Sequence, residues 1–379
     1  MPNSTNKSNA NPFLARQQML FLALQEARLD ALALNPGPSL TYLTGLHFHL
    51  SERPVVALFT ANQPIRLVLP ELEQAKLLDL PYTVQGYPYG EDPEKWAVSF
   101  QAAIHAGGLE SSRVGVEPSR LRLLEFRLLL QAAAEADYIS AQDSLASLRM
   151  IKDTSEIEAM RKAAQIAQAA LTATIPYIRF GISESELASE LTLQILRAGS
   201  DSEIPFAPIV SAGPNSANPH ATPSARLLQP GDLLVMDFGA SHQGYFSDIT
   251  RTFALGDIAP EYARIAQVVL EANTASRSIA RPGITAHEVD QAARTMIEAA
   301  GYGAFFTHRT GHGLGLEGHE EPYIRQGSSL ILKPGMTFTI EPGIYLPRQN
   351  GVRIEDDVVI TATGLESLTD YPREVIQLP

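Results

Sequence analysis

One hydrophobic pattern occurs twice along the chain, in residues 228–239 and again in residues 332–343. Each copy begins with Leu-x-Pro-Gly, continues through a short apolar or β-branched run, and ends in an acidic residue that glycine follows two positions later. A short apolar run after a Pro-Gly turn is typical of a buried strand. The two acids, Asp237 and Glu341, stand 104 positions apart. Because a buried carboxylate is costly unless it is paired or binds a metal, we expect both acids to belong to one site.

Predicted helices repeat at nearly the same interval as these strands. Each helix begins at a capping box, in which Ser or Thr precedes Glu by three positions, and ends at a glycine. The two copies are Ser183 with Glu186 before Gly199, and Thr285 with Glu288 before Gly301. A repeat of 102 to 104 residues is too long for a solenoid and indicates two halves of one domain, packed about a pseudo-twofold axis.

The first part of the chain alternates helical and strand patterns and predicts a separate α/β domain over residues 12–145. Its helices are expected at 13–29, 94–105 and 119–134, its strands at 55–59, 65–69 and 113–117, and a turn at 35–38. A capping box of Ser155 and Glu158 predicts the start of a long alanine-rich helix. We therefore place the domain boundary within residues 141–153, and the second domain at residues 150–379.

Length and composition narrow the class of protein. A chain of 379 residues is long for a single core and favours two domains. The formal net charge of −13 argues against a nucleic-acid or anionic-membrane partner, since both require basic patches. No apolar run approaches the ~20 residues that span a bilayer. Residues 1–11 are polar and indicate a disordered tail rather than a signal peptide. We therefore expect a cytoplasmic protein.

The chain contains no cysteine, so any metal must be held by carboxylate and imidazole groups. Asp248 follows Asp237 by 11 positions, and residues 241–244 between them predict a turn. A turn at that point would place the two acids across a hairpin from each other. Taken singly, each acid is as well explained by a strand end or an exposed strand position.

A third group of acids lies in the strand-like segment 352–358. Strand alternation puts Arg353, Glu355 and Asp357 on one face and Asp356 on the other. Such a charge run is usually a solvated edge. Periodicity alone does not choose between Glu355 and Asp357 as a functional residue.

Residues 307–319 hold three of the nine histidines in a glycine-rich context. Residues 313–318 match the dinucleotide-binding pattern G-x-G-x-x-G, but that fingerprint requires a following amphipathic helix, and residues 320–322 (Glu-Glu-Pro) predict none. The zinc motif H-E-x-x-H is also absent, because no histidine stands three positions after the His319-Glu320 pair. The glycines are better explained by a backbone that passes close to a ligand or metal.

The acids together make a stronger case than any one of them. Asp237, Asp248, Glu341 and one acid of segment 352–358 would repel strongly in a site of low dielectric constant. Two divalent cations would balance four carboxylates, and an oxygen-rich set with one imidazole suits Mn²⁺ or Co²⁺ and tolerates Zn²⁺. Two ions ~3.5–4 Å apart can bridge a water and lower its pKa toward ~7. The natural chemistry is hydrolysis of an amide.

At these motifs the chain resembles the pita-bread metallopeptidases, in the branch of aminopeptidase P and Xaa-Pro dipeptidase (prolidase). The resemblance extends from residue 151 to the C-terminus. It implies that Asp248 and Glu355 bridge two metal ions, that Asp237 holds one ion, and that His312 with Glu341 holds the other. It thereby selects Glu355 over Asp357. The implied fold class is α/β (α+β), with a pita-bread domain of duplicated halves.

The N-terminal half resembles the extra α/β domain of this branch, most clearly at residues 42–46 (Tyr-Leu-Thr-Gly-Leu) and 52–54 (Glu-Arg-Pro). Methionine aminopeptidases generally lack that domain, which argues against them. The resemblance also implies a homodimer. It gives Glu341 the role of general base, gives His319 the role of stabilising the oxyanion together with one metal, and implies substrate contacts for His220, His308 and Arg353.

One departure from the family bears on the substrate. Prolidases often carry an arginine shortly after the equivalent of His319, suited to pairing with the free carboxylate of a dipeptide. Here that place holds Tyr323, which we also expect to contact substrate. The leading prediction is therefore an Xaa-Pro aminopeptidase that cleaves before proline at the second position, with Xaa-Pro dipeptidase as the alternative. A creatinase-like amide hydrolase or a non-catalytic binding module is disfavoured because all five ligands are present.

Overall fold

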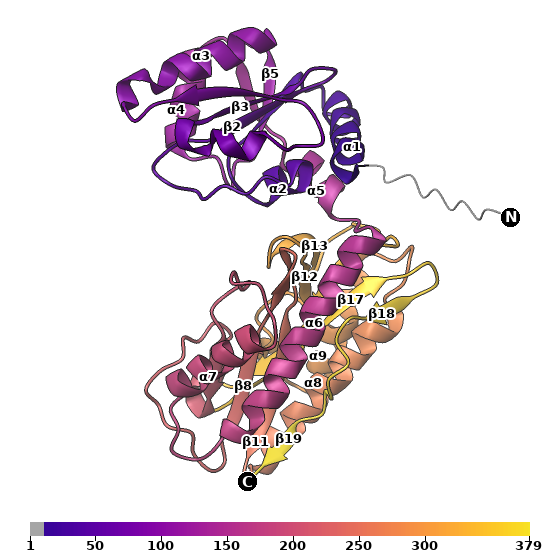
Figure 1. The fold of residues 1–379 in the computed structure, drawn as a ribbon. Coiled ribbons are helices and arrows are strands. Elements are labelled where there is room, and N and C mark those ends of the chain that lie inside the picture. The colour runs from indigo at the N-terminus through magenta and orange to yellow at the C-terminus, as the bar shows by residue number, and fades with distance from the viewer. Residues whose placement is uncertain (1–10) are drawn as a thin grey trace, which may run out of the picture. The chain divides into compact units, whose positions relative to one another are not determined.

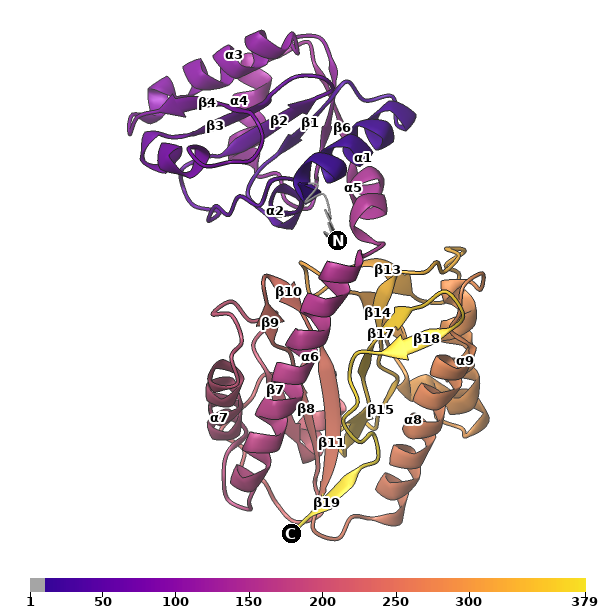
Figure 2. The same ribbon diagram turned by 45° about the vertical axis from the view of Figure 1, so that its right-hand side comes forward.

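The structure, a computed structural model, describes residues 11–379, which form two compact units divided between Arg149 and Met150. The expected tail, residues 1–11, lies outside the described residues except for Asn11, whose side chain caps the first helix. Figures 1 and 2 show one sheet between helices in the first unit, and two main sheets flanked by helices in the second. No helix within residues 11–379 is long and apolar enough to cross a membrane.

The N-terminal unit has three layers around a six-stranded mixed sheet of order β4-β3-β2-β1-β5-β6. Its strands are β1 (Ala31–Leu34), β2 (Val56–Thr60), β3 (Ile65–Pro70), β4 (Val84–Tyr89), β5 (Arg113–Val116) and β6 (Asp137–Ser140). Helices cover both faces (Figure 2): on one side α3 (Trp96–Gly107) and α4 (Leu123–Ala132), on the other α1 (Pro12–Glu26), α2 (Pro38–Thr44) and α5 (Gln142–Arg149).

The strands and helices predicted for this unit are confirmed within a few residues, but several short elements were missed. The strands β1, β4 and β6 lack a clear period-two pattern, so no alternation predicts them. The turn expected at residues 35–38 ends in Pro38, which is the first residue of α2. Helix α5 lies inside the segment that was expected to be the boundary.

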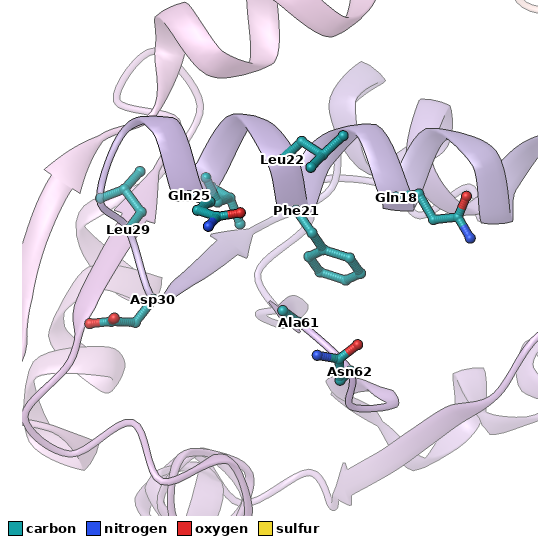
Figure 3. A pocket seen from close by; sticks show the side chains of 9 residues that line it. Gln18, Phe21, Leu22, Gln25, Leu29, Asp30, Ala61 and Asn62 are labelled. Carbon is teal, nitrogen blue, oxygen red and sulfur yellow. The ribbon is translucent and has the colours of Figure 1, made fainter.

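A surface pocket of this unit lies between α1 and the turn that joins β2 to β3 (Figure 3). Phe21 and Leu22 of the helix line it together with Ala61 and Asn62 of the turn. All residues predicted to carry chemistry belong to the other unit. The pocket is therefore no part of the predicted catalytic site.

The C-terminal unit contains two main sheets and two short hairpins. One sheet has the order β19-β11-β8-β7, with β7 (Ile209–Ala212), β8 (Leu233–Phe238), β11 (Ile249–Leu255) and β19 (Ile376–Leu378). The other has the order β13-β12-β14-β17-β18, with β12 (Gly311–Gly313), β13 (Glu320–Ile324), β14 (Thr337–Ile340), β17 (Asp356–Ile360) and β18 (Leu365–Ser367). The hairpins pair β9 (Ser241–His242) with β10 (Tyr245–Phe246), and β15 (Gly343–Tyr345) with β16 (Gly351–Arg353).

The predicted duplication is confirmed in the backbone. The helix α7 (Glu184–Arg197) and its counterpart α9 (Ala286–Ala299) both begin with the predicted capping boxes. Each half also makes the same long-range contact, because the amide of Gly181 donates to Leu228 at 3.1 Å and that of Gly283 donates to Leu332 at 3.0 Å. The remaining helices, α6 (Thr154–Thr174) and α8 (Pro260–Ile279), complete the two helix pairs (Figure 2).

The capping box predicted for the long helix α6 was wrong by two residues. Asp153 is the N-cap, and Glu156 closes the box by accepting from the Asp153 amide at 2.8 Å. Ser155, the predicted cap, instead donates its amide and hydroxyl to Asp153. Two overlapping sequence pairs fit the capping pattern, and the ionised Asp153 takes the position because a carboxylate is favoured at a helix N-terminus.

Strand alternation decides which face of each sheet carries the acids. In β8, Leu234, Met236 and Phe238 join the core formed with α6 and α7, so Asp237 faces away from those helices. In β14, Phe338 and Ile340 pack into a core that includes α9 residues. The apolar faces therefore turn toward helices, and the acidic strand ends meet on the inner side.

The duplicated Pro-Gly turns provide a matched test of backbone packing. Gly231 and Gly335 share a φ of 88°, where an L-residue costs ~1–2 kcal/mol. A Cβ on Gly335 would also lie 2.9 Å from the Lys152 carbonyl oxygen, whereas one on Gly231 would meet nothing closer than 3.7 Å. We expect Gly335→Ala to lower the free energy of unfolding by ~1–3 kcal/mol more than Gly231→Ala. Urea denaturation measures both, and equal losses would contradict this account.

Candidate active site

The five predicted metal ligands come from five strand ends or connections of the C-terminal unit. Asp237, Asp248, His312 and Glu355 are buried, and the Glu341 side chain is 14% exposed. Asp237 lies in β8 and His312 lies in β12. Asp248 immediately precedes β11, Glu341 immediately follows β14, and Glu355 lies between β16 and β17.

The predicted hairpin brings the first two acids together. The turn between β9 and β10 consists of Gln243 and Gly244, both with positive φ, as a two-residue hairpin requires. Beyond it, β11 runs antiparallel to β8 with Thr250 opposite Asp237. The two main sheets then meet at this strand, because the amide of Glu355 donates to the Thr250 carbonyl at 3.1 Å.

Segment 352–358 forms two strands rather than the single strand that was expected. Arg353 ends β16 and Asp356 begins β17, and the two strands belong to different sheets. The side chains nevertheless divide as alternation predicted. Glu355 lies in the cluster, Asp357 accepts from the amide of Asp248 at 2.9 Å, and Asp356 turns away to Arg251.

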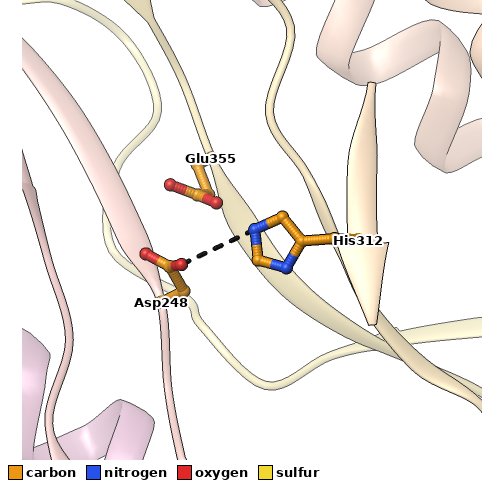
Figure 4. Close-up of side chains that lie close together, drawn as sticks. All are labelled: Asp248, His312 and Glu355. Atoms are coloured by element: carbon orange, nitrogen blue, oxygen red, sulfur yellow. Dashed lines mark ion pairs between the residues drawn. The ribbon is translucent and has the colours of Figure 1, made fainter. Parts of the chain in front are cut away.

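Asp248, His312 and Glu355 form a compact donor set (Figure 4). One potential ligand atom from each residue lies within 4.8 Å of the other two. The Nε2 atom of His312 is 3.8 Å from Asp248 Oδ2 and 3.5 Å from Glu341 Oε1. Its Nδ1 lies 3.1 Å from the Gly313 carbonyl oxygen and donates to it. Burial lowers the pKa of His312 well below its usual range, so the ring is neutral and its Nε2 lone pair faces carboxylates.

Burial and mutual repulsion raise the pKa values of the carboxylates, whereas burial lowers that of His312. The pKa of Asp248 is raised well above its usual range by burial, then by the charges of Glu355 and Asp237. The pKa of Glu355 is also raised well above normal, by burial and by Glu341. Burial raises the pKa of Glu341 to about 8, although Arg353 opposes the shift. The charge of Arg353 therefore does not offset the burial and mutual repulsion of these acids.

Two observations test whether this set fits a metal ion. Within residues 11–379, the buried Oδ1 atoms of Asp237 and Asp248 have no hydrogen-bond partner. The neutral imidazole of His312 aims a lone pair, not a proton, at the same space. Buried acceptors facing one another need a cation between them, and a metal-ligating histidine characteristically donates its other N–H to a backbone carbonyl. The residues fit a divalent cation.

A chain of hydrogen bonds fixes Arg353 beside the cluster. Its guanidinium donates to Asp237, to Tyr345 Oη at 2.9 Å, to Thr250 Oγ1 at 3.1 Å and to the Pro219 carbonyl. Thr250 in turn donates to Glu355 at 2.6 Å. Arg353 thus links two of the acids through one guanidinium and one hydroxyl.

His308 continues this chain away from the acids. Burial, followed by the charge of Arg353, lowers the pKa of His308 to about 4, so the ring is neutral. Its Nδ1 donates to the Arg309 carbonyl at 2.7 Å, and its Nε2 accepts from Tyr345 at 2.8 Å.

The other predicted residues border the cluster. The rings of His319 and His312 lie 4.0 Å apart, centre to centre, and burial lowers the pKa of His319. Tyr323 stands opposite His312 in the β12–β13 ladder. His220 is exposed, one residue beyond the Pro219 carbonyl that accepts from Arg353.

Several residues that support this site were not predicted. Thr250 acts through a single hydrogen bond to Glu355, which no sequence spacing indicates. Asp357, which alternation placed on the same face as Glu355, accepts from the amide of Asp248, a contact that was not predicted. Lys152 is buried and forms an ion pair of 2.6 Å with Glu320, the residue that follows His319. Sequence alone could not indicate that Glu320 pairs with Lys152, because the two residues are 168 positions apart. Arg309, between two site histidines, was the one residue that its neighbours could have signalled.

Comparison with known proteins identifies the class of this site. Residues 158–362 match metallopeptidase family M24, and residues 16–151 match the creatinase/prolidase N-terminal domain. An Xaa-Pro dipeptidase of Lactobacillus delbrueckii subsp. lactis is 36% identical over 361 residues, covering 94% of this chain and 97% of that one.

Solved structures share the whole architecture. The prolidase of Thermococcus sibiricus is similar with a TM-score of 0.92 and 34% identity, covering 97% of this chain and 100% of that one. The X-Pro aminopeptidase of Thermotoga maritima has a TM-score of 0.83 and 31% identity, covering 96% and 99%. The fold and the matched segments define a metallopeptidase with a pita-bread catalytic domain. The chain belongs to metallopeptidase family M24, which implies a peptide substrate and divalent metal ions.

The raised pKa of Glu341 makes the stability of metal-free protein depend on pH. Its pKa of about 8 in the fold exceeds that of a free glutamate, ~4.3, so the stability that its protonation contributes is present below pH ~4 and is lost as the pH rises through 8. We expect urea unfolding of chelator-treated protein to show a falling free energy from pH 5 to pH 8, and Glu341→Gln to flatten part of that fall. Parallel pH profiles of the two proteins would contradict it.

Proposed function

We propose that this chain is an Xaa-Pro dipeptidase that uses two divalent metal ions, Mn²⁺ first and Co²⁺ or Zn²⁺ as alternatives. Its catalytic domain would span residues 150–379, and residues 12–145 would form the creatinase/prolidase-like domain. The observation that carries the proposal is the neutral His312 lone pair facing three carboxylates whose repulsion no side chain neutralises. A cytoplasmic homodimer stays a prediction.

The proposal reverses the order of the two activities expected from the sequence. The aminopeptidase was favoured because Tyr323 replaces an arginine that prolidases often carry. The similarity to an Xaa-Pro dipeptidase and to a prolidase supports the alternative better, at 36% and 34% identity against 31% for the X-Pro aminopeptidase. The margin is small, so the substrate itself must decide.

The ligands would be the five residues predicted from the resemblance. Asp248 and Glu355 would bridge the ions, Asp237 would hold one, and His312 with Glu341 would hold the other. When bound, such ions polarise a carbonyl oxygen and acidify water, the two requirements of amide hydrolysis. Arg353 orients Asp237 by donating to it, and Thr250 orients one oxygen of Glu355 in the same way.

Proton transfer falls to side chains of this chain. Glu341 is the general base: its carboxylate takes a proton from the attacking water. His319, neutral because burial lowers its pKa, donates an N–H to the oxygen that becomes negative in the tetrahedral intermediate. His220, exposed beside Pro219, contacts the substrate from the other half of the duplication. His308 accepts from Tyr345, which in turn accepts from Arg353, so His308 helps to position both side chains.

Substrate length separates the two activities. We expect kcat/KM on Ala-Pro to exceed that on Ala-Pro-Ala, because a site built for a dipeptide leaves no room for a third residue and pairs its terminal carboxylate. The measurement is product release by chromatography with Mn²⁺, Co²⁺ and Zn²⁺ in turn. A preference for the tripeptide under every metal would favour the aminopeptidase instead.

Replacing the general base tests the chemistry. Glu341→Gln keeps the shape of the side chain but cannot take a proton, so we expect kcat on Ala-Pro to fall by ~10²–10⁴-fold. Elemental analysis reports whether the variant still holds metal, and Glu271→Gln on the exposed face of α8 is the matched control. Wild-type turnover by Glu341→Gln would sink the mechanism, and indifference of every measured property would indicate a binding module.

A further inference from the structure

The proposed dipeptidase activity leaves one requirement unassigned. A dipeptide carries a free carboxylate one residue beyond the bond that is cut, and binding it away from water calls for a cation. Tyr323 stands where prolidases often place an arginine. If the proposed function holds, another side chain must supply that charge.

Arg353 is not available for this task. Its side chain is 3% exposed, and its guanidinium already serves Asp237, Tyr345, Thr250 and the Pro219 carbonyl. Five N–H groups are nearly exhausted by these acceptors. A substrate carboxylate would have to displace Asp237, which the metal site needs.

Arg309 is a second cation near the cluster, and it is free. Within residues 11–379 its guanidinium has neither a hydrogen-bond acceptor nor a carboxylate partner, although the residue is only partly exposed. Arg309 stands three positions before the predicted ligand His312, and its carbonyl oxygen accepts from His308 Nδ1 at 2.7 Å. Its backbone therefore runs beside the cluster.

Tyr323 holds this guanidinium in place. The guanidinium carbon of Arg309 lies 4.4 Å from the centre of the Tyr323 ring, a cation–π contact. The contact follows from register: Tyr323 lies opposite His312 in the ladder, and the amide of Thr310 donates to Ile324 at 3.0 Å. The strand segment that follows Arg309 is thereby fixed against the strand that carries the ring. A guanidinium held over a ring face can still donate its N–H groups to an anion.

We propose that Arg309 binds the free carboxylate of the dipeptide and that Tyr323 is the platform that orients it. The charge that other prolidases supply from the position of Tyr323 is supplied here from the segment that leads into the neighbouring strand β12. A planar guanidinium can donate two parallel hydrogen bonds to a carboxylate, which a lysine ammonium cannot reproduce. Arg309 is thus a specificity residue for substrates that end at proline.

The test compares Ala-Pro with Ala-Pro-amide, which differ only in the charge of the terminal group. We expect Arg309→Met to lower kcat/KM on Ala-Pro by ~10–100-fold, chiefly through KM, and to change kcat/KM on the amide by less than ~3-fold. Arg309→Lys should recover part of the loss, and Tyr323→Leu should show a smaller loss with the same selectivity. Arg325→Met, at an exposed arginine two residues beyond Tyr323, is the matched charge control.

Two results would overturn the inference. If Arg309→Met lost equal kcat/KM on Ala-Pro and on Ala-Pro-amide, Arg309 would have a structural role. If the loss instead differed between Asp-Pro and Lys-Pro, Arg309 would bind the side chain of the first substrate residue. Binding of L-proline and L-prolinamide to Mn²⁺-loaded protein by calorimetry gives a readout without turnover: only proline should weaken in Arg309→Met. If the wild-type protein cleaves Ala-Pro-Ala but not Ala-Pro, the proposed function fails. The calorimetric comparison of proline with prolinamide still tests whether Arg309 binds a carboxylate.

Discussion

The repulsion among buried carboxylates is the constraint on which the catalytic unit depends. Asp237, Asp248, Glu341 and Glu355 converge where water is largely excluded, and burial itself is the largest influence on the pKa of the last three. Such a cluster is unfavourable in isolation, so it persists only because the rest of the fold holds it. The helix pairs, the two sheets and the Pro-Gly turns supply that rigidity, and divalent ions are the natural counter-charge.

Positive charge in the protein is distributed so that it supports the acids without neutralising the cluster. Arg353 pairs with Asp237 directly. Arg251, 2% exposed, pairs with Asp356 on the opposite side at 2.8 Å and also donates to the backbone carbonyls of Tyr371 and Pro372. That second ion pair anchors the start of β17 and the C-terminal segment together. The strand carrying the acids is therefore fixed from both faces, while its inner oxygens stay free for metal.

The duplication and the hairpin could be predicted because their signals are local: capping boxes, Pro-Gly turns and strand-end acids each lie within a few residues. Strands β1, β4 and β6 of the N-terminal unit could not, since their pattern has no clear period of two to detect. The cap of α6 failed because Asp153 and Ser155 both satisfy the local rule, and electrostatics at the helix end chose between them. Likewise, the partners of the cluster, Thr250 and Asp357, depend on register between strands far apart in sequence.

The interpretation of Tyr323 shows why position-by-position comparison can mislead about charge. A missing arginine at one position does not imply a missing charge in the site, because a site requires charge at a point in space, not at a point in sequence. Segments far apart in sequence can bring side chains to the same point, here Arg309 just before β12 and Tyr323 in β13. An aromatic ring at one of them then gains a purpose, because it orients the guanidinium that the other supplies. On the proposed role of Arg309, the charge that meets a substrate is compared by its location in space rather than by residue identity at the position of Tyr323.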